Sequence, residues 1–388
     1  MQREGVCLVG YGEIPNFVPE QGSVASAYSY MSLVTEAVTK ALDNCGLKKK
    51  DVKGVAMVRL GFPTDTPLWA EEMGLELDWV QGVDCGGSSS VISVRRAADA
   101  IQFHGVDVII CAAVTVVHRA RRGGGVESYP FTNYLVPFGY GGPNTSFGLT
   151  QRRHMYEYGT TLEQLGKMVV SFRKNAIPNE NALFRIPLTV EDYMNSRVIS
   201  SPIRLFDCVR LCTGAKAIVM ASERVAKKLT DHPIYLVSDT EKTNYKVDDP
   251  LYDRGITGFA ALGAELFKRV KREGIDCAQL YDDYPIAVLM QLEDLGFCEK
   301  GKGGKFIEEH EITFDGDFPI NTGGGQLSAG QPGGAGSMLH VVEAVRQLKG
   351  EAEGHQVKNA KTALVTGLGL LGFDIPIVVA SGMILQRR

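Results

Sequence analysis

The chain has 388 residues, and its 41 lysines and arginines against 45 aspartates and glutamates give a formal net charge of −4 at pH 7. This balance argues against a protein whose main task is to bind nucleic acid, because phosphate binding needs a basic surface. Hydrophobic residues make up 44% of the chain and charged residues 22%, which is typical of a globular protein and excludes a disordered one. The length predicts two or three domain-sized units around a large core.

The eight cysteines are scattered along the chain, mostly in apolar runs, and no two have the C-x-x-C spacing of zinc ligands. We therefore expect reduced thiols in a cytoplasmic protein and no metal site in this chain. The first residues lack the layout of a signal peptide, and no apolar run approaches the length of a membrane span, so we expect no association with a membrane.

The first predicted elements in chain order are a strand, a helix and a second strand. Val6–Gly10 is a short apolar run before a glycine-rich turn, and Tyr30–Cys45 carries apolar residues at helical spacing. Gly54–Arg59 then reads as a strand. The later segments Phe259–Lys271 and Ala278–Asp282 follow the same plan of a helix, a closing turn and a strand.

A second pair of passages repeats as well. A glycine-rich turn opens a predicted helix, Val91–Phe103, which leads to the strand Val108–Ala113. Late in the chain another glycine-rich turn opens the helix Met338–Leu348, which leads to the strand Thr362–Thr366. Each half therefore reads as strand, helix, strand, glycine turn, helix, strand. This repeat predicts an α/β fold of two similar layered halves packed together.

An insertion separates the two repeats. Residues 117–205 are rich in Gly, Pro, Tyr, Asn and Arg, with helices predicted near Gln151–Tyr158 and Leu162–Asn175. A long insertion in a compact fold is typical of a lid or a binding region, although it can also be a plain surface excursion. We expect an N-terminal half, residues 1–232, which carries the insertion, and a C-terminal half, residues 233–388.

Cys85 is the candidate nucleophile. It lies in the run V-D-C-G-G-S-S-S at the predicted start of a helix. The free N–H groups at a helix N-terminus stabilise a thiolate and lower the pKa of the thiol. The neighbouring glycines allow another group to approach the main chain closely. A buried cysteine in a tight turn accounts for this segment equally well.

Three other segments contain candidate side chains. Tyr281–Tyr284 (Y-D-D-Y) ends a predicted strand, where α/β proteins commonly place their sites, and its carboxylates suit acid–base work, a metal or a helix cap. His118 follows the strand Val108–Val117 and is either a base or a hydrogen-bonded structural histidine. The glycine-rich run Gly323–Gly336 has no nucleotide-binding pattern and could line a carbonyl oxygen or a phosphate.

In this order, these segments resemble the thiolase superfamily, specifically the branch that contains the thiolase part of sterol carrier protein X. The resemblance implies a thiolase fold, in which two repeated βαβαβ halves form a five-layered αβαβα core with an inserted loop domain. It also implies a homodimeric core and coenzyme A bound beneath the loop domain. The stretches that carry the resemblance are His154–Met168, Ser196–Cys212, Leu292–Gly304 and Ile320–Ser337.

The departures from the family concern its catalytic side chains. Relatives carry a nucleophilic cysteine just before the helix that is predicted after residue 90. Alignment of the preceding strand places this cysteine at Cys85, whereas alignment of the helix without a gap places it at Gly87. The family's Gly-His-Pro histidine is Gln331 here, which can donate hydrogen bonds to a thioester oxygen but cannot take a proton from a thiol. The histidine of the His-Asp-Cys-Phe motif is Tyr281, and Thr366–Gly369 lacks a second cysteine.

A sister group in the same branch has a tyrosine at the position of Tyr281 and often lacks the nucleophilic cysteine. Those proteins resemble retro-aldolases that shorten steroid side chains held as CoA thioesters, with a partner that contains a zinc ribbon and an OB-fold. This chain nevertheless keeps Cys85 and a glycine loop of thiolase length. The mixture also resembles benzoylsuccinyl-CoA thiolase, which needs a zinc-finger and OB-fold partner as well.

Three functions are therefore open. The favoured one is a thiolase acting on a bulky β-ketoacyl-CoA through Cys85, with Gln331, Asn321 and loop N–H groups stabilising the oxyanion and Tyr281 or His118 moving protons. The second is a retro-aldolase acting on a β-hydroxyacyl-CoA with Tyr281 as base. The third is an acyl-CoA-binding scaffold without catalysis.

The predicted ligand is coenzyme A, as part of the substrate or product. Its phosphates need basic partners, although a solvated basic loop accounts for each candidate arginine equally well. The resemblance also implies a small zinc-ribbon/OB-fold subunit that would hold the only zinc. The candidate residues for binding coenzyme A are Arg121, Arg122, Arg152, Arg153, Gly324 and Gly325.

Overall fold

The computed structural model describes residues 5–19, 29–58, 65–117, 132–246, 248–249, 251–253, 255–369 and 377–388. The strands are β1 (Val6–Phe17), β2 (Gly54–Val58), β3 (Trp79–Val83), β4 (Val108–Thr115), β5 (Val198–Ser200), β6 (Ile203–Arg204), β7 (Thr213–Ser222), β8 (Ile234–Thr243), β9 (Cys277–Gln279), β10 (Thr362–Gly369) and β11 (Val379–Arg387). The α-helices are α1 (Tyr30–Cys45), α2 (Asp65–Glu72), α3 (Ser89–His104), α4 (Thr132–Leu135), α5 (Pro143–Tyr158), α6 (Leu162–Ala176), α7 (Val190–Asn195), α8 (Glu223–Leu229), α9 (Gly258–Leu266), α10 (Pro285–Asp294), α11 (Gly303–Glu309), α12 (Gly325–Ala329) and α13 (Gly336–Lys349).

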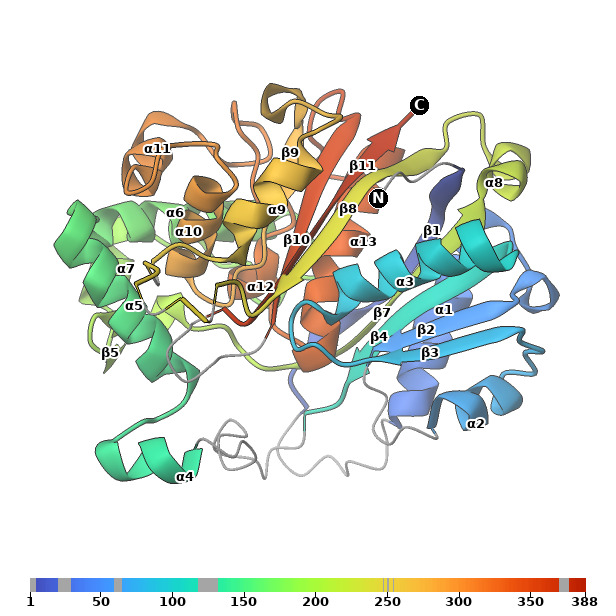
Figure 1. Cartoon of the computed structure of the whole chain (residues 1–388), viewed down its shortest axis with the longest axis horizontal. Helices are drawn as coiled ribbons and strands as arrows, with labels where there is room; N and C mark the ends of the chain where they lie inside the picture. Colours follow the sequence, from blue (N-terminus) through green and yellow to red (C-terminus); the bar gives the residue numbers. More distant parts are fainter. Residues whose placement is uncertain are drawn as a thin grey trace.

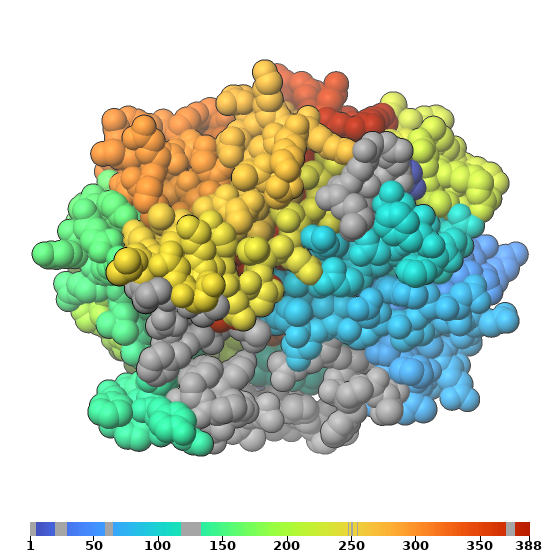
Figure 2. All heavy atoms as spheres, in the orientation of Figure 1, coloured from blue at the N-terminus to red at the C-terminus, as the bar shows by residue number. Residues whose placement is uncertain are grey.

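Among the described residues, the main sheet has nine strands in the order β3-β2-β4-β7-β1-β8-β11-β10-β9. Its first five strands come from the N-terminal part of the chain and its last four from the C-terminal part. The two groups join where β1 and β8 pair antiparallel, with Cys7 opposite Tyr235 and Leu8 opposite Ile234. The N-terminal elements in blue and cyan and the C-terminal elements in yellow and orange therefore form one continuous body (Figure 2).

Helices cover the sheet in layers (Figure 1). The helices α3 and α13 contact each other and strands of both groups, so they form a shared middle layer. On the outer faces, α1 packs on β1, β4 and β7, and α9 packs on β8 and β11. This alternation of helix and sheet confirms the predicted α/β class and its layered arrangement.

The burial of the helices follows their sequences. In α13 every residue from Gly336 to Leu348 is buried, as expected for a helix between two sheet faces. In α1 only one stripe is buried, at Leu33, Val34 and their helical neighbours. Gly46 ends α1 in the left-handed conformation with φ 74°, which a glycine adopts without a steric penalty.

Two predicted elements are longer than the observed ones. The helix predicted to reach Lys271 ends at Leu266, and the strand predicted to reach Asp282 ends at Gln279. Beyond β9, the side chain of Asn321 takes the place of a neighbouring strand. Its Oδ1 accepts from the N–H of Leu280 at 2.7 Å, and its Nδ2 donates to the carbonyl oxygen of Leu280 at 2.9 Å.

The segment between β4 and β7 contains α4 to α7 and the small sheet of β5 and β6. Its helix α6 packs on α12 and α11, which belong to the C-terminal part of the chain. None of the helices in the described ranges combines the length and the apolar character that crossing a membrane requires.

Candidate active site

Tyr281 lies where the parallel strands β9 and β10 end, at the edge where α/β sheets commonly place their sites. Its main chain is fixed from two sides. Its N–H donates to Oγ1 of Thr366 at 2.9 Å, and its carbonyl oxygen accepts from Nε2 of Gln291 at 2.8 Å. Thr366 in turn donates to Oε1 of Gln291 at 2.6 Å. This closed ring of hydrogen bonds holds the base of the tyrosine in place.

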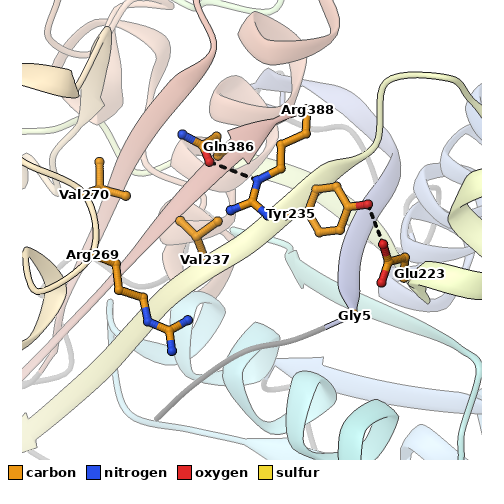
Figure 3. A pocket seen from close by; sticks show the side chains of 8 residues that line it. All are labelled: Gly5, Glu223, Tyr235, Val237, Arg269, Val270, Gln386 and Arg388. Carbon is orange, nitrogen blue, oxygen red and sulfur yellow. Dashed lines mark hydrogen bonds between the residues drawn. The ribbon is translucent and has the colours of Figure 1, made fainter.

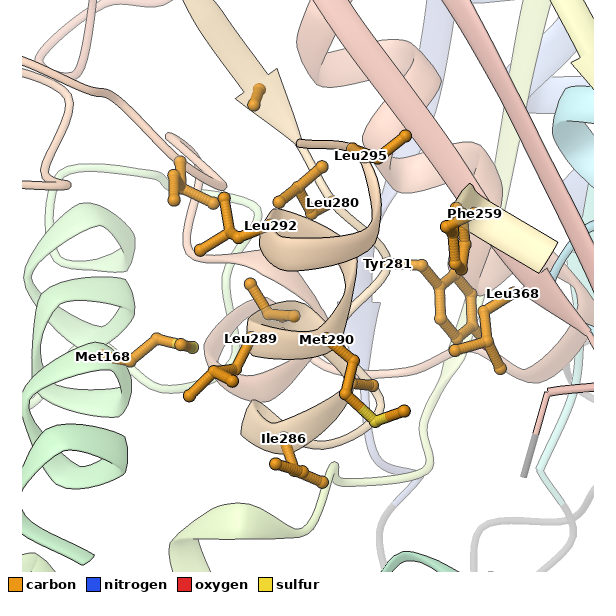
Figure 4. Close-up of a cluster of buried hydrophobic side chains, with 14 of the residues drawn as sticks. Met168, Phe259, Leu280, Tyr281, Ile286, Leu289, Met290, Leu292, Leu295 and Leu368 are labelled. Carbon is orange, nitrogen blue, oxygen red and sulfur yellow. The ribbon is translucent and has the colours of Figure 1, made fainter. Parts of the chain in front are cut away.

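The phenol ring of Tyr281 is buried beside Phe259 and Leu368 (Figure 4). A Cβ atom at Gly87 would overlap Cζ and Oη of this ring and the main-chain oxygen of Leu368. Only glycine therefore fits at position 87. The phenol fills the space that a side chain at this position, two residues before α3, would need.

Polar side chains surround the hydroxyl of Tyr281. Burial and the charge of Asp283 hold the pKa of Tyr281 well above its ordinary value, while the amides of Gln331 and Gln326 oppose this rise. Nε2 of Gln331 also donates to Oδ1 of Asp283 at 3.0 Å. Both amides lie close enough to the phenol to influence its pKa, but Oε1 of Gln331 and both amide atoms of Gln326 make no well-formed hydrogen bond with the described residues. Buried amides in this state are suited to receive a ligand.

The two carboxylates of the Y-D-D-Y segment have different surroundings. Asp282 accepts from the main-chain N–H groups of Gln326 at 2.8 Å and Leu327 at 3.2 Å, so it anchors the start of α12. Asp283 lies beside the tyrosine instead. Burial, followed by the charge of Asp282, raises the pKa of Asp283 to about 7. Asp283 is therefore a carboxyl group that can exchange a proton near neutral pH.

His340 reaches the same place from α13. It is fully buried, its ring centroid lies 6.0 Å from that of Tyr281, and its Nε2 lies 3.2 Å from Oδ1 of Asp282. The sequence did not indicate His340 or Gln326 as site residues, because neither lies at a distance along the chain from the Y-D-D-Y segment that matches a known motif. Only the packing of α12 and α13 against the end of β9 brings them together.

Cys85 lies four residues before α3 and is half-buried. Burial raises the pKa of its thiol, and the charges of Glu241 and Asp84 add to the rise, against the charge of Arg96. The prediction that the helix N-terminus lowers this pKa is therefore wrong. The helix begins only at residue 89, and the acidic neighbours disfavour a thiolate. The role of Cys85 as a nucleophile stays a prediction.

Asn321 and the first loop glycines have structural contacts. The amide of Asn321 is bonded to the main chain of Leu280, as described above, so its predicted oxyanion role competes with this structural one. Gly324 and Gly325 have φ values of 100° and 59°. A Cβ at Gly325 would overlap the carboxylate of Asp282. These contacts explain both glycines without a ligand, and their binding of coenzyme A stays a prediction.

Of the candidate coenzyme A arginines in the described residues, Arg152 and Arg153 lie exposed on α5. Arg153 donates to Oε1 of Glu157 and to Oδ1 of Asp253, both at 2.8 Å. Two carboxylates thus already balance its charge, and Arg152 is the freer candidate of the two for a phosphate. His118, Arg121 and Arg122 lie outside the described residues.

Two of the sequence stretches that resemble the thiolases meet in a buried polar cluster. His154 lies 3.1 Å from Oε2 of Glu293 and 2.8 Å from Oγ1 of Thr160. Nζ of Lys300 lies 3.2 Å from the same Glu293 oxygen. This cluster ties α5 to α10, so these residues maintain the fold around the site rather than line it.

No metal-binding group of three or more His, Cys, Asp or Glu side chains exists within the ranges that the structure describes. A surface pocket of about 480 Å³ lies elsewhere, beside β8 and the end of β11 (Figure 3). It is lined by Tyr235, Arg269 and Arg388 among others, and it contains none of the candidate residues.

The chain is similar to known enzymes over most of its length. A family model described as "Thiolase C-terminal domain-like" matches residues 256–381. A steroid side-chain-cleaving aldolase of Thermomonospora curvata is 31% identical over 397 residues, which cover 97% of this chain and 98% of the relative. Benzoylsuccinyl-CoA thiolase subunit BbsB of Thauera aromatica is 31% identical over 226 residues, 57% of this chain and 58% of that subunit.

A solved structure agrees with these relatives. The Ltp2-ChsH2(DUF35) aldolase superposes with a TM-score of 0.85 at 30% identity, covering 98% of this chain and 97% of that chain. Together with the layered fold, these similarities confirm the family that the sequence predicts. The chain belongs to the thiolase superfamily, in the branch that contains steroid side-chain-cleaving aldolases and sterol carrier protein thiolases.

Proposed function

We propose that the chain is the catalytic subunit of a retro-aldolase that cleaves a β-hydroxyacyl-CoA. The observation that carries this proposal is the placement of Tyr281 against Gly87. When the helix is aligned without a gap, residue 87 is where thiolases of this branch carry their nucleophile. Here the phenol fills that space. Two similar proteins are named as aldolases, which also favours an aldolase reaction.

The reaction breaks the bond between the α- and β-carbons of the substrate. The β-hydroxyl loses its proton, the β-carbon becomes a ketone or aldehyde, and the bonding electrons pass to the thioester as an enolate. Tyr281 takes the hydroxyl proton while it gives its own to Asp283, since the raised pKa of the phenol prevents it from holding a negative charge itself. Asp283, with a pKa of about 7, holds the proton and returns it through Tyr281 to the α-carbon.

The enolate oxygen needs hydrogen-bond donors. The amide nitrogen of Gln331 uses one N–H on Asp283 and has a second available. Gln326 has a buried amide with no hydrogen-bond partner among the described residues. We infer that these amides stabilise the enolate oxygen, because fixed donors in a dry site stabilise developing charge strongly.

A thiolase that works through Cys85 is the second candidate. Two observations favour it: the thiol is only half-buried, and BbsB, a similar subunit, belongs to a thiolase. In that reaction the Cys85 thiolate attacks the β-keto carbon, and the C–C bond breaks with its electrons leaving on the enolate of a shorter acyl-CoA, which is then protonated. The thiol of a second coenzyme A takes the acyl group from the sulfur and releases Cys85.

Intact-mass analysis separates the two reactions. We expect a β-hydroxyacyl-CoA to yield a carbonyl compound and a shorter acyl-CoA with no acyl adduct on the chain, and Cys85→Ala to keep this activity. Cys298→Ala, which removes another half-buried thiol, is the matched control. An acyl adduct that forms from a β-ketoacyl-CoA and disappears only in Cys85→Ala would establish the thiolase instead.

The chain should be tested together with a partner. We propose a homodimeric core with a small zinc-ribbon/OB-fold subunit. Two similar proteins support the presence of a partner subunit: the Ltp2-ChsH2(DUF35) aldolase, whose name joins two proteins, and BbsB, which is named as a subunit. The assays therefore use the chain co-expressed with the product of a neighbouring gene that encodes such a subunit.

The rate of cleavage is expected to depend on pH through Asp283. Because only the carboxylate can take a proton, kcat/KM rises with pH and reaches half of its plateau near the pKa of about 7. Asp283→Asn removes this rise together with most of the rate. The exposed Asp315 is a control, and Asp315→Asn should keep the rise. A rate that does not change between about pH 5 and about pH 8 in the unaltered chain would contradict this role.

The same pKa has a consequence for stability that does not depend on activity. The folded chain binds the Asp283 proton more tightly than the unfolded chain, so this group contributes stability at low pH that is lost as the pH rises to about 7. Asp283→Asn should therefore raise the melting temperature at neutral and alkaline pH and change it little in acid.

A further inference from the structure

Lys216 lies in the middle of β7 with its side chain fully buried. Its Nζ donates to Oδ1 of Asn16 at 3.0 Å and lies 3.3 Å from Oε2 of Glu13. Burying an ammonium group costs free energy unless the group is paired and hydrogen-bonded. Nothing in the proposed chemistry uses this lysine directly, so its partners indicate what it does.

Asn16 connects the lysine to the glycine loop. Its Nδ2 donates to the main-chain oxygen of Ala329 at 2.8 Å and to that of Gly330 at 3.4 Å. Because Lys216 can only donate, it fixes Oδ1 as the acceptor and turns Nδ2 toward the loop. A Cβ at Gly214 would lie 2.5 Å from Oδ1 of Asn16, so this amide is also held tightly from β7.

The loop contact lies directly before Gln331. Gly330 has φ 100°, and the N–H of Gln331 donates to the main-chain oxygen of Arg210 at 2.8 Å. The N–H of Cys212 donates back to the oxygen of Gln331 at 3.1 Å. The direction of the Gln331 side chain, and its bond to Asp283, therefore depends on how the preceding peptide groups are held.

The buried charges around Lys216 balance one another. Glu13 pairs with Arg346 as well as with the lysine, and Arg346 lies 2.6 Å from Oε2 of Glu343. The network spans β1, β7 and α13, three elements of the rigid core. Because these elements belong to the buried core, the network fixes the position of Asn16, and Asn16 in turn binds the loop.

We propose that Asn16 and Lys216 are positioning residues that hold the loop so that the amide of Gln331 meets Asp283. This inference rests on the proposed function, because it assigns Gln331 and Asp283 to that reaction. Neither Asn16 nor Lys216 touches the substrate. Their effect passes through the peptide groups of residues 329 and 330.

Asn16→Asp is the most specific test, because the aspartate side chain has the shape of asparagine and can still accept from Lys216. Its second carboxylate oxygen, however, faces the carbonyl oxygens of residues 329 and 330 and cannot donate to them. We expect kcat to fall about 30-fold with KM nearly unchanged, as for lost positioning of a catalytic group. Since the bond from Gln331 lowers the pKa of Asp283, the variant should also move the pH at half-maximal rate upward. Should Asn16→Asp fail to fold, Asn16→Ser carries the same test.

A double-mutant cycle with Gln331→Leu decides whether Asn16 acts through Gln331. In the Gln331→Leu background, we expect Asn16→Asp to lower kcat little further. If the fold-losses in kcat of the two single variants multiply in the double variant instead, the proposal is overturned. Asn179→Asp is the matched control, because the buried Asn179 donates to the oxygen of Gly323 at 2.8 Å, at the other end of the same loop. It should not shift the pH profile.

A readout without turnover separates this inference from the proposed reaction. The carboxyl carbon signal of Asp283, identified by its absence in Asp283→Asn, can be titrated by NMR in the ligand-free chain. A higher pKa in Asn16→Asp and Gln331→Leu alike supports the positioning role even if the substrate class is wrong. An unchanged pKa in Asn16→Asp, with the expected rise in Gln331→Leu, overturns it.

Discussion

Replacing Tyr281 by phenylalanine is expected to lower kcat for cleavage of a β-hydroxyacyl-CoA about a thousandfold. The change removes only the hydroxyl, so the ring keeps its contacts with Phe259 and Leu368 and the main-chain bonds to Thr366 and Gln291 remain. The substrate then has no group that can pass its proton to Asp283. The rate of release of the carbonyl product measures the effect.

Tyr284 provides the control for this prediction. It is also buried, and its hydroxyl donates to Oδ1 of Asn144 at 2.6 Å while its ring stacks on Phe147 at 4.3 Å. Tyr284→Phe should therefore cost some stability but leave the pH profile of cleavage unchanged. If Tyr281→Phe retained full turnover while Tyr284→Phe did not, the base would have to be sought elsewhere.

Gly87→Ala is expected to abolish cleavage and to destabilise the fold. The new methyl group would collide with the phenol of Tyr281 and with the main-chain oxygen of Leu368, and overpacking of this kind costs about 3 kcal/mol. Denaturant unfolding and the cleavage assay measure the two effects. Gly82→Ala is the matched control, because a Cβ at Gly82 in the nearby strand β3 meets no atom within 4 Å.

A second substitution tests whether the collision with the phenol is the cause. In a Tyr281→Ala background the ring is absent, so Gly87→Ala should lose less stability than in the unaltered chain. The contact with Leu368 remains and limits the recovery. An equal loss of stability in both backgrounds would show that the tyrosine does not occupy the space at residue 87.

Much of the fold was predictable because its signals are local. The helical spacing of Tyr30–Cys45 and the glycine turns before α3 and α13 are readable in the sequence, and all three helices appear where they were expected. The antiparallel strands β7, β8 and β11 were not predicted one by one. Most of their pairing partners lie far away in the chain, as when β1 pairs with β7, although β11 also pairs with the preceding strand β10.

The site was predictable only in part. Tyr281 and Gln331 follow from the resemblance, and the Y-D-D-Y carboxylates from their place after a strand. The pKa of Cys85 was predicted in the wrong direction, because burial of the thiol raises it and the charge of Glu241, which comes from β8 far away in the sequence, adds to the rise. The sequence also does not predict that the phenol of Tyr281 occupies the space beside Gly87, because this contact depends on how α3 and the end of β9 pack together.

The contact between residues 87 and 281 imposes an order on the history of this site. In an ancestor with a side chain at position 87, a tyrosine placed like Tyr281 would have met that side chain and could not have been accommodated. Loss of the side chain at position 87 must therefore have come first, or together with the tyrosine. If the side chain at position 87 was lost first, the lineage passed through a chain with neither group, and such an intermediate had a cavity between the two positions.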